Sequence, residues 1–127
     1  MELDISGCHV EPYLFKTIGP NCAKLEKLTC QSCSGLDDYA LQAIGEIVTR
    51  HRKLSTLDFS GCVHFSDEGI LALLQTGPRT IKSLNFSNCR SLTSCGMAVR
   101  TYINPLIYDC STIYSQHCSL TIEFSRV

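Results

Sequence analysis

The sequence predicts an α/β fold in which one strand–helix unit repeats along the chain. A phrase close to Leu-x-apolar-Ser-x-Cys occurs four times, as LDISGC, LTCQSC, LDFSGC and LNFSNC. The copies begin at Leu3, Leu28, Leu57 and Leu84, so they lie 25, 29 and 27 residues apart. A fixed period of roughly 20 to 30 residues is typical of a solenoid, because one unit cannot bury its apolar face alone.

Each phrase is followed by a loop and then by apolar residues at helical spacing. We expect Pro12 to open the first helix, Ser66 and Thr93 to cap the third and fourth, and Pro105 to stop the fourth. The expected apolar helix faces comprise Leu14, Phe15 and Ile18, then Ile44, Ile47 and Val48, then Leu71, Leu73 and Leu74, and finally Val99, Tyr102 and Ile103.

Three copies also carry a leading apolar residue, namely Leu25, Leu54 and Ile81. The pattern Leu-x-x-Leu-x-apolar-x-x-Cys is the leucine-rich-repeat signature. Strands and helices that alternate with one hand predict a leucine-rich-repeat solenoid. We expect a short right-handed horseshoe, with a parallel sheet on the concave face and helices on the convex face. Residues 1–104 would form an array of about four repeats.

The repeat fails after Pro105, so residues 105–127 are interpreted as a divergent C-terminal tail. Alternating apolar and polar residues return only at Leu120–Ser125, which is typical of a strand. Two alternatives remain open for this region: an irregular last strand after an insertion, or a tail that ends the array.

Alternation within each strand predicts which residues face a partner. We expect the apolar positions of the repeated phrase to point inward, so the residues that alternate with them point out of the concave face. We predict a partner-binding face made of three rows, comprising Glu2, Lys27, Thr56 and Ser83; Asp4, Thr29, Asp58 and Asn85; and Ser6, Gln31, Ser60 and Ser87.

Composition and charge argue against several classes of function. The formal net charge of −1 provides no basic field for nucleic acid. The longest apolar stretch, Gly69–Leu74, is too short to cross a bilayer, and Glu2 and Asp4 stand where a secretory signal would be basic. Nine cysteines cannot all pair within the chain, so a reducing compartment is favoured, either the cytoplasm or the nucleus.

The cysteines first suggest metal or redox chemistry, and the repeat register favours a structural interpretation. Cys30 takes the inward slot that Phe59 and Phe86 occupy, so Cys30-x-x-Cys33 is not expected to bind metal. Cys8, Cys33, Cys62 and Cys89 share the loop slot, and we expect a ladder of buried thiols that satisfies backbone amides. Asp109, Cys110, His117 and Cys118 form a weak metal-like cluster in the tail. No metal, cofactor or enzymatic activity is predicted.

The segments CAKLEKLTCQSCSGLDDYAL and HRKLSTLDFSGCVHFSDEGI resemble the cysteine-containing class of leucine-rich repeats, with Cys22 at the leading cysteine of that pattern. This class is typical of F-box/leucine-rich-repeat proteins. The resemblance implies a protein partner, such as a substrate segment presented to an SCF-type ubiquitin ligase. No stretch resembles an F-box, so ligase assembly would require parts outside this chain. The alternative function is a structural scaffold or spacer in a larger assembly, for example a ciliary or mitotic-regulatory one.

Overall fold

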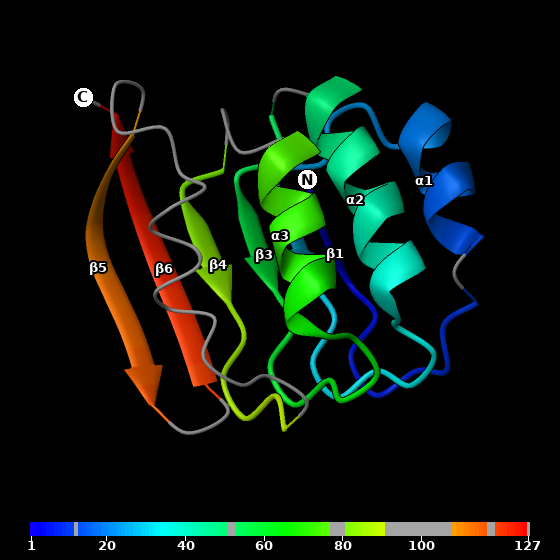
Figure 1. Cartoon of the computed structure of the whole chain (residues 1–127). Coiled ribbons are helices and arrows are strands. Elements are labelled where there is room, and N and C mark those ends of the chain that lie inside the picture. The colour runs from blue at the N-terminus through cyan, green and yellow to red at the C-terminus, as the bar shows by residue number, and fades with distance from the viewer. Residues whose placement is uncertain (12, 51–52, 77–80, 91–107, 117–118, 127) are drawn as a thin grey trace.

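The computed structural model describes residues 1–11, 13–50, 53–76, 81–90, 108–116 and 119–126. Short strands alternate with helices in the first 90 residues, and a pair of longer strands follows (Figure 1). In chain order the elements are β1 (Glu2–Asp4), α1 (Leu14–Asn21), β2 (Lys27–Thr29), α2 (Asp38–Arg50), β3 (Thr56–Asp58), α3 (Asp67–Thr76), β4 (Ser83–Asn85), β5 (Tyr108–Gln116) and β6 (Ser119–Arg126).

The described strands form one six-stranded sheet in the order β1-β2-β3-β4-β6-β5. Strands β1 to β4 are parallel, and their register aligns Leu3, Leu28, Leu57 and Leu84 across the sheet. Helices α1, α2 and α3 pack along one face of these four strands (Figure 1). A parallel sheet with helices on one face is compatible with the predicted leucine-rich-repeat fold. The horseshoe shape stays a prediction.

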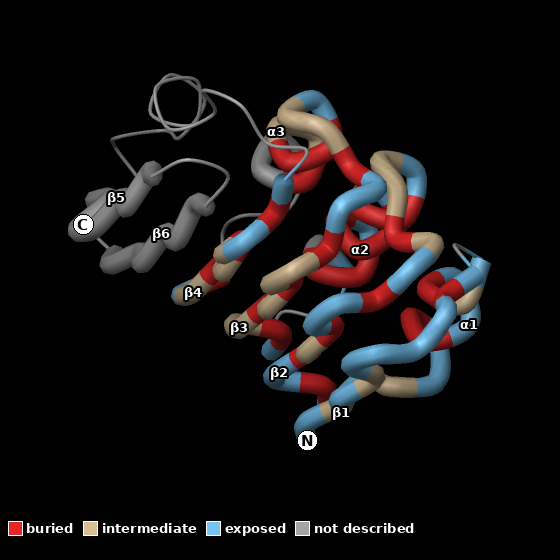
Figure 2. The backbone as a smooth tube through the Cα atoms, turned by 90° about the horizontal axis from the view of Figure 1, so that it is seen from below, coloured by how far each residue is buried: buried red, intermediate tan, exposed pale blue. Residues whose placement is uncertain are grey.

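The core lies between the strands and the helices, where Figure 2 shows the buried segments facing one another. Leu28, Leu57 and Leu84 are fully buried in the centre of their strands. Phe59 and Phe86 stack with ring centroids 5.4 Å apart, and Phe65 meets both rings edge-on. Aromatic pairs in these geometries add about 0.5–1.5 kcal/mol beyond area burial, so they stabilise the packing of the third repeat on the fourth.

Helix α2 confirms its predicted apolar face, because Ile44, Ile47 and Val48 are all buried. Its first turn is capped by Asp37, whose Oδ1 accepts the backbone N–H of Ala40 at 2.9 Å. The first four backbone N–H groups of a helix have no partner within the helix, so they need such acceptors.

The predicted apolar face of α3 is confirmed at Leu73 and wrong at Leu71. Ile70 and Leu73 are buried, and Leu71 is only partly buried. The i, i+3 pair Ile70 and Leu73 projects from one side of a helix, whereas Leu71 is turned by about 100° from Ile70. The side chain of Leu74 lies outside the described residues.

Helix α1 buries Phe15 and Ile18 as predicted, with Leu14 partly buried. It begins at Leu14, and the expected opener Pro12 lies outside the described residues. The predicted fourth helix, with Thr93, Val99, Tyr102, Ile103 and Pro105, also lies outside them, and so does the proposed array boundary at residue 104.

The turn after each strand takes the left-handed backbone conformation at one position. Gly7 and Gly61 have φ of 75° and 74°, and Ser32 and Asn88 have φ of 54° and 58° at the equivalent places. Glycine adopts this region without a steric penalty, whereas an L side chain pays about 1–2 kcal/mol. The residue before each cysteine of the repeated phrase is therefore the point where the chain turns away from the sheet.

The alternating segment Leu120–Ser125 falls within β6, which pairs antiparallel with β4. The register places Leu84 opposite Ile122. β5 pairs antiparallel with β6 at the outer side of the sheet. The segment is thus a strand, and its direction sets it apart from the parallel repeats.

Among the described residues, no helix combines the length and apolar character needed to cross a bilayer.

Candidate functional site

The predicted partner-facing residues form three rows across the parallel strands. The register pairs Glu2 with Lys27, Lys27 with Thr56, and Thr56 with Ser83. The next row joins Asp4, Thr29, Asp58 and Asn85 in the same way. We call these eight residues, together with the third row of Ser6, Gln31, Ser60 and Ser87, the polar strip. Their positions agree with the sequence analysis, and their role in binding stays a prediction.

Backbone hydrogen bonds extend the sheet ladder into the third row. Gly7 donates to the carbonyl of Gln31 at 2.8 Å, Ser32 to Ser60 at 2.7 Å, and Gly61 to Ser87 at 2.8 Å. Since strand and turn are both held by these bonds, the polar strip stands on a fixed backbone. Its residues are exposed or partly exposed, with Glu2, Lys27 and Gln31 among the exposed ones.

Three strip residues fold back onto the amide two positions later. Asp4 Oδ1 accepts the backbone N–H of Ser6 at 2.9 Å. Asp58 Oδ1 and Asn85 Oδ1 accept the N–H of Ser60 and Ser87 at 3.0 and 2.9 Å. In the third and fourth repeats the serine hydroxyl also donates to the same oxygen. These Asx-type turns satisfy amides at the strand ends and fix the side chains that make them.

The second repeat lacks this turn, and Gln31 instead links its neighbours. The backbone N–H of Gln31 donates to the hydroxyl of Ser6 at 3.0 Å, and its side-chain amide donates to Asp58 Oδ2 at 2.8 Å. Partial burial works to raise the pKa of Asp58. Hydrogen bonds from Ser60 and Gln31 and the charge of Lys27 outweigh it and lower that pKa below its usual value. Asp58 is therefore ionised and oriented at neutral pH.

The thiol ladder is present in three of its four predicted positions. Cys33, Cys62 and Cys89 are buried, whereas Cys8 is exposed, so the expectation for Cys8 is wrong. The buried thiols donate to backbone carbonyls of the preceding repeat, namely Ile5 at 3.1 Å, Cys30 at 3.0 Å and Phe59 at 3.2 Å. The groups they satisfy are carbonyls, where we expected amides, because a protonated thiol is a donor.

Burial governs the chemistry of these cysteines. Loss of solvent raises the pKa of the Cys62 thiol to about 11 and that of Cys89 to about 12, and it also raises the pKa of Cys30. Thiolate is the form that binds metal and attacks disulfides. The interpretation of Cys30 as a core residue agrees with its complete burial. Among the described residues, no group of three or more ligand-type side chains gathers at one point. The tail cluster at residues 109–118 lies where side chains are not described.

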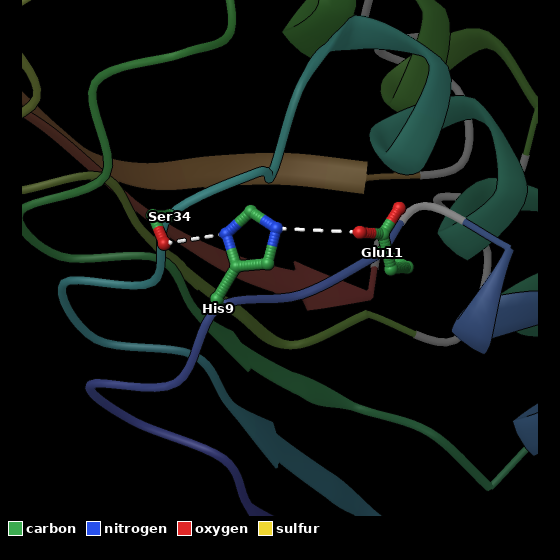
Figure 3. A network of polar contacts seen from close by, with 3 residues as sticks. All are labelled: His9, Glu11 and Ser34. Atoms are coloured by element: carbon green, nitrogen blue, oxygen red, sulfur yellow. Dashed lines mark hydrogen bonds and ion pairs between the residues drawn. The ribbon is translucent and has the colours of Figure 1, made fainter.

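A contact that sequence reasoning missed joins the loops of the first two repeats (Figure 3). His9 Nδ1 lies 2.9 Å from the hydroxyl of Ser34, and His9 Nε2 lies 3.3 Å from Glu11 Oε1. A hydroxyl, an imidazole and a carboxylate in line is the order used in nucleophilic catalysis, where the carboxylate is buried. Here the side chains of His9 and Glu11 are 67% and 71% exposed, so we interpret the contact as a surface link between repeats. No local sequence signal indicates it.

Asp38 is a second missed residue, and it joins the starts of two helices. Its Oδ1 accepts the backbone N–H of Ser66 at 2.6 Å, and its Oδ2 accepts the Ser66 hydroxyl at 2.7 Å. Gly69 lies against the same carboxylate, where a Cβ would collide with Asp38. Ser66, which we expected to cap α3, thus donates both its N–H and its hydroxyl to the preceding repeat, and its role as a cap stays a prediction. One sequence signal for this contact was available. Gly69 lies in the first turn of α3, and a glycine inside a helix can mark a place where another part of the chain approaches the backbone closely.

Comparison with known families adds one match. A family model described as "Leucine Rich repeat" matches residues 50–74, which contain β3 and most of α3. This match supports a leucine-rich-repeat family. Repeats of this family generally mediate protein–protein interaction and are typically not enzymes. A search of curated proteins finds no match to the chain.

Proposed function

We propose that this chain is a protein-recognition module that binds a partner segment across the polar strip. The observation that carries the proposal is the bonded set of Asp58, Ser60 and Gln31, which orients polar groups on the outer face of the sheet. Groups that are already fixed lose little conformational entropy when a partner binds, so they favour specific recognition.

The charges of the strip indicate what the partner carries. Glu2, Asp4 and Asp58 are acidic, and Lys27 lies among them. A hydrogen bond from the Ser6 side chain, aided by one from its backbone, lowers the pKa of Asp4, which favours a charged carboxylate there too. Such a surface suits a partner segment with basic and hydrogen-bonding side chains. Binding should weaken as salt concentration rises, because exposed charges are screened.

We further propose that the partner is a substrate segment of an SCF-type ubiquitin ligase, with the ligase-docking part supplied outside this chain. The repeated cysteine supports this proposal, since Cys33, Cys62 and Cys89 occupy the slot that typifies the F-box/leucine-rich-repeat class. We place the activity in the cytoplasm or nucleus, in keeping with free thiols at the six cysteines whose side chains the structure describes.

Site-specific photo-crosslinking in cells tests the face that is used. A photoreactive residue at Thr56 samples the polar strip, and one at Gln42 samples the exposed side of α2 as the matched control. We expect discrete protein adducts from Thr56, no comparable adducts from Gln42, and a loss of adducts when Glu2→Lys is added. Ubiquitin-ligase subunits among proteins that co-purify with the adduct would support the ligase role.

The spacer alternative gives the opposite pattern. A passive spacer would be held through its helices or ends, so adducts would form from Gln42 and would not respond to Glu2→Lys. Adducts from Gln42 alone, or none from Thr56, would contradict recognition by the polar strip.

A further inference from the structure

The outer edge of β1 presents backbone acceptors that point away from the sheet. β1 is the end strand of the described sheet. Ile5 donates its N–H to the carbonyl of Thr29 at 2.9 Å, and Gly7 donates to Gln31 at 2.8 Å. In a trans peptide the carbonyl points opposite to the N–H of the next residue. The carbonyls of Asp4 and Ser6 therefore point to the open edge.

In the strands that follow β1, each of the two equivalent carbonyls accepts one backbone N–H from the preceding repeat. Cys30 and Ser32 donate to Asp58 and Ser60, both at 2.7 Å. The backbone N–H groups of Phe59 and Gly61 donate to the carbonyls of Asn85 and Ser87, both at 2.8 Å, with the same two-residue spacing. On β1 the described residues supply Ser6 O only with the Cys8 thiol at 3.9 Å. They supply no such donor to Asp4 O, so two acceptors are open.

The side chain of Asp4 repeats the arrangement of Asp58 with one bond missing. Each carboxylate uses Oδ1 to accept the N–H two residues later. Asp58 Oδ2 also accepts the side-chain amide of Gln31 from the preceding repeat at 2.8 Å. The matching oxygen of Asp4 has no amide donor among the described residues. The phrase LDISGC of β1 thus presents the same edge that LDFSGC of β3 presents to β2.

Apolar groups near the β1 end of the described core show the same missing neighbour. The partly buried apolar side chains that pack against the described core are Leu3, Ile5, Leu14 and Cys22. The Cys8 thiol is exposed, whereas its counterpart Cys62 is buried and donates to the repeat before it. The edge therefore combines open hydrogen-bond acceptors with apolar surface, as sites of β-strand addition do.

We propose that the β1 edge binds an extended protein segment that adds to the sheet in parallel and has the chemistry of β2. Two backbone N–H groups, two residues apart, pair with the carbonyls of Asp4 and Ser6. A side-chain carboxamide reaches Asp4, and a basic side chain lies beside Glu2, as Lys27 does on the other side of β1. Glu2, Asp4 and Ser6 also belong to the polar strip. The edge-facing backbone carbonyls of Asp4 and Ser6 take no part in the proposed function, so this proposal does not rest on it.

A second copy of this chain fits the edge less well. Two β1 strands that meet about a twofold axis run antiparallel, which brings Glu2 and Asp4 of one copy beside the same carboxylates of the other. Like charges opposite one another destabilise a strand pair. A basic partner strand gains from the same charges.

The probe is a fluorescein-labelled peptide with the sequence of Leu25–Ser32, titrated with the full chain under reducing conditions and followed by fluorescence anisotropy. In the chain this segment already occupies an Asp-x-Ser edge. The control peptide carries Cys30→Pro, which removes the N–H expected to pair with Asp4. The chain variant is Asp4→Asn, because Asn85 makes the same turn with Ser87. That variant keeps the turn and loses the second acceptor oxygen.

We expect saturable binding of the unmodified peptide, and binding weaker by roughly tenfold for the Pro peptide and for Asp4→Asn, the size of one hydrogen bond to a charged group. The thermal unfolding of Asp4→Asn should match that of the unmodified chain. Equal binding of the two peptides, or no saturable binding, would overturn the proposal. Sedimentation that shows a dimer which the peptide cannot compete away would assign the edge to a second copy and overturn it as well.

Discussion

The first and third repeats carry nearly the same phrase, LDISGC and LDFSGC, in different surroundings. Leu57 and Cys62 are fully buried. Leu3 is partly buried and Cys8 is exposed. Both repeats make the same Asp-to-Ser turn and the same left-handed bend at glycine. Local conformation therefore follows the phrase, whereas burial depends on the repeat that packs in front of it.

The comparison also explains why the thiols differ. Cys62 donates to the carbonyl of Cys30, which the second repeat supplies. In the part of the chain that the structure describes, the Cys8 thiol donates to the carbonyl of Ser6 in its own turn, at 3.9 Å. A buried carbonyl and a buried thiol satisfy each other, so each depends on its partner. Matched substitutions in the two repeats can measure how much the preceding repeat contributes.

The largest difference should come from the central leucines. Leu57→Ala removes a fully buried side chain and should lower the free energy of unfolding by about 2–5 kcal/mol. Leu3→Ala should cost about 1 kcal/mol, because that side chain is only partly buried. Urea titration followed by circular dichroism measures both. Equal losses would contradict the open edge at β1.

The cysteines should give the next largest difference. Cys62→Ala leaves the buried carbonyl of Cys30 without its donor and should cost about 1–3 kcal/mol. Cys8→Ala removes an exposed group and should change stability by less than about 0.5 kcal/mol. The same denaturation assay applies. A marked loss for Cys8→Ala would indicate that the first repeat is covered in solution.

Alkaline pH should weaken the third repeat through its thiol. The folded state raises the pKa of Cys62 from 9.0 to about 11, so it favours the protonated thiol. The stabilisation is fully present below pH 9.0 and is lost as pH rises through about 11. The difference in unfolding free energy between the unmodified chain and Cys62→Ala should therefore shrink over this interval. A difference that stays constant from pH 9.0 to about 11 would contradict this role of the Cys62 thiol.

The smallest difference should come from the turn glycines. Gly7→Ala and Gly61→Ala both place a Cβ at positive φ, at about 1–2 kcal/mol each. At Gly61 the new Cβ would also lie 2.7 Å from the Ser32 hydroxyl, whereas nothing lies within 4 Å at Gly7. Because Ser32 can rotate, we expect Gly61→Ala to cost less than about 1 kcal/mol more than Gly7→Ala. Thermal unfolding of the two variants measures the difference, and a larger cost at Gly7 would contradict it.

Much of the candidate site could be predicted from the sequence. Side chains alternate across a strand, so placing Leu28 and Leu57 inward fixed Lys27, Thr29, Thr56 and Asp58 outward. Helix faces were less certain, as Leu71 shows, because neighbouring apolar residues in α3 offer more than one stripe. The Asp38–Ser66 and His9–Ser34 contacts could not be predicted, since each joins residues more than 20 positions apart whose loops must first be stacked.

The sequence by itself determined the strand–helix period, the inward leucines and the outward rows, because these depend on residue spacing and on the two-residue period of a strand. Only the tertiary structure decided which carbonyl each buried thiol meets, that the Cys8 thiol is exposed, and that Gln31 bonds to Asp58. Those contacts depend on the distance and rotation between stacked repeats, which packing of the core fixes. The same stacking leaves the carbonyls of Asp4 and Ser6 directed to the open edge of β1.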